Sequence, residues 1–73
     1  MENYKLQKSE TPNFWVLTDL KNEYVIVFEH KKYNETQKIT PLNDENPDDF
    51  MLIARILRQA GEWLVKHHSD KAF

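Results

Sequence analysis

The amino-acid sequence predicts an α+β domain in which a four-stranded antiparallel meander is followed by one long C-terminal helix packed on one face of the sheet. Three observations support this fold class. Short segments rich in aromatic and β-branched residues alternate with turn-forming residues up to Pro41, which is typical of consecutive strands. A helix-start signal follows at Asn46–Asp49. Apolar residues then recur at helical spacing until about His68.

Four strands are expected at about residues 4–7, 13–18, 23–31 and 36–40. The second and third are richest in aromatic and β-branched residues, whereas the first and fourth are shorter and more polar, as edge strands usually are. The segments Asp19–Asn22 and Tyr33–Glu35 are expected to form tight reversals, and Asn22 tolerates the left-handed conformation that closes such a turn. Strands joined in this way pair in sequence order.

The C-terminal helix is expected at about residues 47–68. Asn46 is a suitable N-cap, and Pro47 suits the first helical position because its fixed φ is already helical. The two aspartates that follow lie near the positive end of the helix dipole, and the basic segment Lys66–His68 lies near its negative end. The whole chain, residues 1–73, is therefore read as one domain.

Length and composition leave few ways to stabilise such a domain. A chain of 73 residues is near the lower limit at which a hydrophobic core suffices, and it contains no cysteine for disulfide bonds. Association is the remaining common solution. The net charge of −2 argues mildly against nucleic acid or anionic membranes as the main partner. No unbroken apolar run is longer than five residues, and we expect a cytoplasmic protein.

The residue types that carry chemistry do not form a known pattern here. His67 and His68 are adjacent, so on a helix they point about 100° apart, and no third ligand is spaced to join them. His30 is interpreted as a cross-strand neighbour rather than a general base. The single glycine, Gly61, leaves no phosphate-binding loop. We therefore expect no enzymatic activity, no cofactor and no metal.

Apolar surface is in excess on both predicted layers. Apolar positions cover roughly 220° of the helix, more than a helix resting on one core needs, and both faces of the central strands are apolar. The surface left over is covered either by the N-terminal segment and the connector before the helix, or by a partner. We expect a partner, most simply a second copy in a homodimer, otherwise a different protein. The expected interface residues are Trp15, Leu17, Leu52, Ile56 and Trp63.

An alternative function is that of a nucleic-acid-binding accessory protein that uses lysines on and beside the last two strands. These are Lys21, Lys31, Lys32 and Lys38. A three-stranded sheet followed by a helix is also how the arm-binding domains of some integrases read the major groove. Glutamates interleaved with these lysines, and the absence of arginine from the strands, argue against it.

Four segments carry a resemblance to a known group of proteins. They are Trp15–Asp19, Phe28–Glu29, Asn34–Thr40 and Trp63–His68. In their order and spacing, over residues 13 to 68 or so, the chain resembles short uncharacterised proteins of gut Bacteroidetes. The resemblance implies a stand-alone bacterial protein rather than a fragment of a larger enzyme, and it implies no activity.

Overall fold

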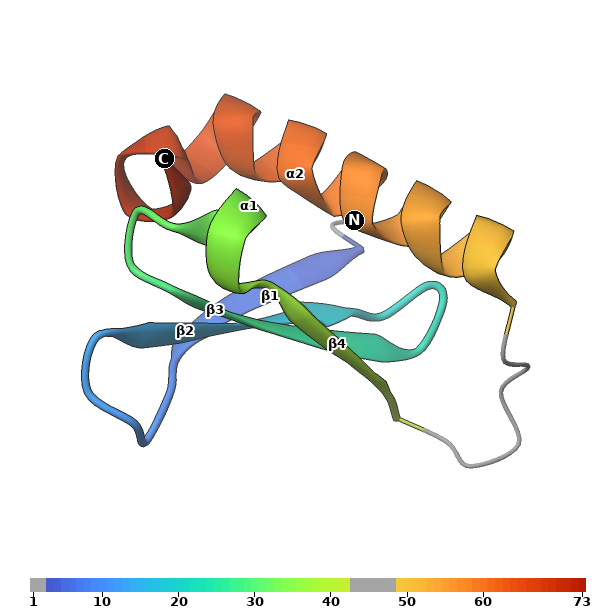
Figure 1. Ribbon diagram of the computed structural model, residues 1–73, viewed down its shortest axis with the longest axis horizontal. Helices are drawn as coiled ribbons and strands as arrows, with labels where there is room; N and C mark the ends of the chain where they lie inside the picture. The colour runs from blue at the N-terminus through green and yellow to red at the C-terminus, as the bar shows by residue number, and fades with distance from the viewer. Residues whose placement is uncertain (1–2, 43–48) are drawn as a thin grey trace.

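The computed structural model describes residues 3–42 and 49–73. The elements are β1 (Tyr4–Lys8), β2 (Phe14–Asp19), β3 (Tyr24–Glu29), α1 (Tyr33–Thr36), β4 (Lys38–Pro41) and α2 (Phe50–Ala72). The strands form one antiparallel sheet in the order β1-β2-β3-β4. Figure 1 shows α2 lying across one face of this sheet, with no helix over the opposite face. The predicted fold class is confirmed.

The strand register decides which side chains lie beneath α2. Leu6, Leu17, Ile26 and Ile39 are direct partners across the four strands, so their side chains share one face. Of this row, the two central members are fully buried and the two edge members are half-buried. This row therefore marks the covered face.

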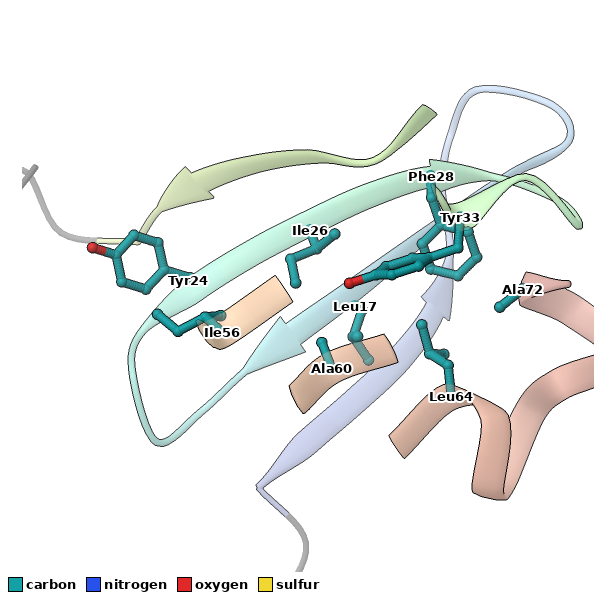
Figure 2. Packing of buried hydrophobic residues seen from close by; sticks show 9 residues of the cluster. All are labelled: Leu17, Tyr24, Ile26, Phe28, Tyr33, Ile56, Ala60, Leu64 and Ala72. Carbon is teal, nitrogen blue, oxygen red and sulfur yellow. The ribbon is translucent and has the colours of Figure 1, made fainter. Parts of the chain in front are cut away.

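The core joins the covered face to α1 and α2. Its buried residues are Leu17, Tyr24, Ile26, Phe28, Tyr33, Ile56, Ala60, Leu64 and Ala72. Figure 2 shows these side chains converging from the sheet and the helices. Ile56, Ala60 and Leu64 lie one helical turn apart and form the buried stripe of α2. Burying a large apolar side chain such as Leu or Phe contributes about 1.5–3 kcal/mol, so this cluster is the main source of stability.

Helix α2 begins with a side-chain cap at Asp49. Its carboxylate Oδ1 accepts hydrogen bonds from the backbone N–H groups of Met51 at 3.0 Å and Leu52 at 3.3 Å. The predicted cap, Asn46, and the predicted first turn, Pro47 and the aspartate after it, lie outside the described residues.

The helix continues past its predicted end near His68. This residue has non-helical dihedral angles (φ −144°, ψ 41°), and the last turn is bent there. The bend brings Ala72 into the core, where it is fully buried, and the backbone N–H of Lys31 donates to the carbonyl of Lys71 at 2.7 Å. The predicted end therefore coincides with a change of direction rather than with the end of the helix.

The connection between β3 and β4 differs from the predicted reversal. Strand β3 ends at Glu29 rather than near Lys31, because Lys31 adopts a positive φ of 63°. The short helix α1 follows, and its Thr36 hydroxyl accepts from the N–H of Glu29 at 2.8 Å and donates to the carbonyl of Lys32 at 2.7 Å. Since these bonds hold Thr36 in α1, β4 begins two residues later than predicted.

The turn between β2 and β3 forms where it was predicted. Asp19 is buried, and its Oδ1 accepts from the backbone N–H groups of Lys21 and Asn22, both at 3.0 Å. The residue with positive φ is Glu23 (62°) rather than Asn22, whose side chain instead donates to Asp19 Oδ2 at 2.9 Å. The aspartate therefore specifies the turn, as expected from its side-chain chemistry.

Candidate functional site

Two of the predicted interface residues are buried in the chain's own core. Leu17 is 0% exposed and Ile56 is 1% exposed, because both side chains belong to the core between the sheet and α2. A partner cannot reach either side chain while the domain is folded. The prediction is wrong for these two residues, because the covered face of β2 is the one that carries Leu17.

The other three predicted residues, Trp15, Leu52 and Trp63, are half-buried at the margin of the core. The Trp63 ring centroid lies 5.2 Å from that of Tyr4 and 5.1 Å from that of His67, so intramolecular contacts occupy much of it. Burial, followed by the nearby charges of Asp19 and Glu62, raises the pKa of Tyr4. Trp15, Leu52 and Trp63 therefore pack against the edge of the core and are only partly accessible to a partner.

The opposite face of the sheet carries the uncovered apolar surface. Its central residues, here called the open face, are Phe14, Val16, Thr18, Val25 and Val27. Val16 pairs with Val27 and Thr18 pairs with Val25, so four of these side chains form two adjacent rows. All five remain partly exposed, and none of the described elements lies over them. From Tyr4 onward the N-terminal segment forms β1 within the sheet and does not lie over this face. The connector before the helix, the other segment predicted as a possible cover, lies outside the described residues from residue 43 to residue 48.

Polar side chains surround the open face on both edge strands. Lys5 and Gln7 project on the same side from β1, and Lys38 and Thr40 do so from β4. All four are exposed. An apolar centre with a polar rim is the usual anatomy of a protein–protein interface.

The edge strands contain the signal that identifies this face. Both faces of β2 and β3 are apolar, so alternation within those strands does not distinguish them. In β1 and β4, however, Leu6 and Ile39 alternate with Lys5 and Lys38. Once the register is known, the apolar edge positions align with Leu17 and mark the covered face.

A second apolar surface lies on the outer flank of α2, defined by Phe50, Ala54, Gly61 and Val65. Phe50 is 83% exposed and Val65 is 59% exposed. A groove of about 560 Å³ separates part of this flank from α1. The predicted interface residues Leu52 and Trp63 lie on the opposite flank of the helix, where both are half-buried. The buried stripe of α2 is formed by Ile56, Ala60 and Leu64, and the Tyr33 ring lies beside Gly61, with its hydroxyl donating to the Leu57 carbonyl at 2.6 Å.

The lysines of the nucleic-acid alternative are not brought together. Lys21 lies in the β2–β3 turn, whereas Lys31 and Lys32 follow the other end of β3, a separation of about 20 Å for a strand of this length. Lys32 Nζ is 3.3 Å from Glu29 Oε2, and Lys38 lies on the rim of the open face. These four residues therefore do not form one basic surface.

Similarity to other proteins gives no further guide. No protein-family model, curated protein or solved structure matches the chain. The resemblance to short proteins of gut Bacteroidetes stays a prediction.

Within residues 3–42 and 49–73, no helix is both long and apolar enough to cross a membrane. The same part of the chain contains no group of three or more His, Asp or Glu side chains placed to hold a metal ion. The function has to be argued from the surfaces.

Proposed function

We propose that this protein is an association module that forms a homodimer by packing its open face against the same face of a second copy. The observation that carries the proposal is the outward-facing content of β2 and β3. Antiparallel sheets with one solvated face normally alternate apolar and polar residues, with the polar residues outward. Here the outward positions are Phe14, Val16, Thr18, Val25 and Val27.

The size and shape of the open face suit the pairing of two sheets. Sheets that stack face to face lie about 10 Å apart, with their strands roughly 30° from alignment, and side chains of both inner faces interdigitate. Valine and threonine side chains in adjacent rows present the low, even surface that such packing needs. In a two-fold arrangement one patch serves both subunits, so a single apolar face is sufficient.

The rim allows this pairing without burying charge. Lys5 and Lys38 have long aliphatic stems that can cover the margin of the apolar centre while their ammonium groups remain in water. The same lysines discourage the edge strands from pairing with other chains. The apolar centre and the polar rim of the open face therefore favour a dimer over association into larger, open-ended assemblies.

The mass in solution tests the proposal. At about 100 μM, light scattering should give twice the chain mass of 8.8 kDa. Val16→Lys places a charge in the centre of the open face and should give a folded monomer, because pairing would bury that ammonium group. Circular dichroism should show that the variant remains folded, since residue 16 is already partly exposed.

Val65→Lys is the matched control, because Val65 is an exposed valine on the outer flank of α2. This variant should remain a dimer. The proposal fails if the unmodified protein is a monomer at this concentration. It also fails if Val65→Lys dissociates the dimer and Val16→Lys does not, which would assign the interface to α2. A complex only with a different protein would replace the second copy as the partner.

A further inference from the structure

A pocket of about 400 Å³ lies at one end of the sheet, between the β1–β2 loop and the end of β3. Its volume is within the range of small-molecule sites in proteins. Trp15 supplies aromatic surface, and its cross-strand partner Lys8 and the nearby His30 supply polar groups. None of its lining residues is acidic. The pocket therefore combines aromatic walls with a positive charge.

A hydrogen bond between two lining residues fixes which imidazole nitrogen of His30 is a donor. The Trp15 indole Nε1–H donates to His30 Nδ1 at 3.1 Å. Because Nδ1 is the acceptor, the proton of the neutral imidazole is on Nε2, which is then a donor. The ammonium group of Lys71 lies 5.8 Å from the Trp15 ring centroid and 3.8 Å from Asp70 Oδ2, so its charge is already paired. The Nε2 donor and the Lys8 ammonium group favour a ligand that accepts hydrogen bonds.

The walls of the pocket are held in place before any ligand binds. In the β1–β2 loop, Ser9 N–H donates to the Phe14 carbonyl at 3.0 Å, and Thr11 N–H donates to Ser9 Oγ at 3.1 Å. The N–H of His30 donates to the Asn13 carbonyl at 2.8 Å, which ties the loop to the end of β3. A site that is already ordered loses little conformational entropy on binding.

We propose that this pocket binds a small aromatic carboxylate. The ring of the ligand packs against Trp15, and its carboxylate accepts hydrogen bonds from the Lys8 ammonium group and from His30 Nε2–H. Aromatic rings prefer offset or edge-on contacts of this kind, and charge-assisted hydrogen bonds are the stronger class. The pocket shares only Phe14 with the open face, so this proposal does not depend on dimer formation.

Titration with benzoate, followed by NMR of the two indole N–H signals, tests the proposal. The Trp15 signal should shift and saturate below about 10 mM, as expected for a ligand of this size, while the Trp63 signal stays in place. Benzamide retains the ring without the charge, and acetate retains the charge without the ring. Each should bind at least about tenfold more weakly than benzoate.

Two lysine variants on β1 distinguish a direct contact between Lys8 and the ligand from a general effect of the protein's net charge. Lys8→Gln should weaken benzoate binding about tenfold, because Lys8 lines the pocket. Lys5→Gln, on the same exposed strand but on the opposite face of the sheet, should change it less than twofold. The absence of a saturable Trp15 shift would overturn the proposal. So would equal binding of benzamide or acetate, or equal effects of the two substitutions.

Discussion

At the scale of single residues, Tyr33 makes the most consequential contacts in the domain. Its ring is edge-on to Phe28, with the two centroids 5.2 Å apart, and its hydroxyl donates to the Leu57 carbonyl. Tyr33 thereby links α1, β3 and α2. Burial, and secondarily the neighbouring Tyr4, raises the pKa of the Tyr33 phenol. A phenol that is buried and donates a hydrogen bond resists ionisation.

Replacing Tyr33 with Phe tests the hydrogen bond to Leu57. The free energy of unfolding in urea should fall by about 1 kcal/mol at neutral pH, because the part-buried Leu57 carbonyl loses one donor. Tyr4→Phe is the control, since Tyr4 is only half-buried and keeps its ring contact with Trp63. If both substitutions cost the same, the bond to Leu57 contributes nothing specific.

The same variant carries a prediction about pH. A phenol whose pKa is raised in the folded state stabilises the fold fully below its ordinary value of 10.0, and this contribution is lost as the pH rises above that value. The stability of the unmodified protein should therefore fall above pH 10.0 more steeply than that of Tyr33→Phe, by up to about 1.4 kcal/mol per pH unit for one proton. Urea denaturation at pH 8–11 measures the difference, and parallel curves would contradict it.

Gly61 allows the close approach of Tyr33 to α2. A Cβ atom at this position would lie 3.2 Å from Tyr33 Cε1, closer than ordinary van der Waals contact. Gly61→Val should lower the free energy of unfolding by about 2 kcal/mol, because the branched side chain displaces the Tyr33 ring. Ala54→Val, at an exposed position of the same helix, should cost about 0.5 kcal/mol from helix propensity alone. Thermal unfolding of both variants gives the comparison.

At the scale of elements, the bent last turn of α2 closes one end of the core. The change of direction at His68 places Ala72 in the core, and Phe73 contacts the Tyr33 ring, with 5.8 Å between the two centroids. Without the bend, a straight helix would leave this end of Tyr33 uncovered. The last turn is therefore part of the folded core rather than a frayed end.

Substitution of Ala72 by Asp tests whether this turn belongs to the core. The free energy of unfolding should fall by at least about 2 kcal/mol, because an unpaired carboxylate would replace a fully buried methyl group. Ser69→Asp, in the same turn but exposed, should change it by less than about 0.5 kcal/mol. Equal small effects would show that the last turn is open in solution.

The sequence predicted the strands and the long helix better than it predicted which of their faces are buried. Turn residues such as Asp19 and the period of each segment act locally, so strand order, sheet type and the presence of α2 followed from them. The helix α1 was missed because a segment of four residues, Tyr33–Thr36, has no periodicity to detect. The covered face and the buried flank of α2 depend on contacts between distant residues, such as Tyr33 with Gly61. The alternation within β2 and β3 does not distinguish the two faces, and only the alternation of Leu6 and Ile39 with lysines in the edge strands indicates the covered one.

At the scale of the whole molecule, two layers enclose one core and leave one sheet face uncovered by any described element (Figure 1). The domain gains most of its burial between these layers, and an 8.8 kDa chain buries a smaller share of its surface than a larger one does. A homodimer through the open face would convert the two-layer domain into a four-layer assembly. Its stability would then depend on protein concentration.

That dependence is measurable by heating. The midpoint temperature of the unmodified protein should rise between about 5 and 500 μM, because association stabilises the folded state by mass action. Val16→Lys should lower the midpoint and remove its dependence on concentration. A midpoint that is constant over this range in the unmodified protein would exclude a dimer that dissociates on unfolding.

The order of the strands has a consequence for how the chain folds. Each strand pairs only with its neighbours in the sequence, through short loops between β1 and β2 and between β2 and β3, and through α1 between β3 and β4. Short loops close at little entropic cost, and topologies of low contact order fold quickly. The docking of α2 is the step that brings distant segments together. In the folded domain, Leu6 and Ile39 at the edges lie with Leu17 and Ile26 on the face that α2 covers.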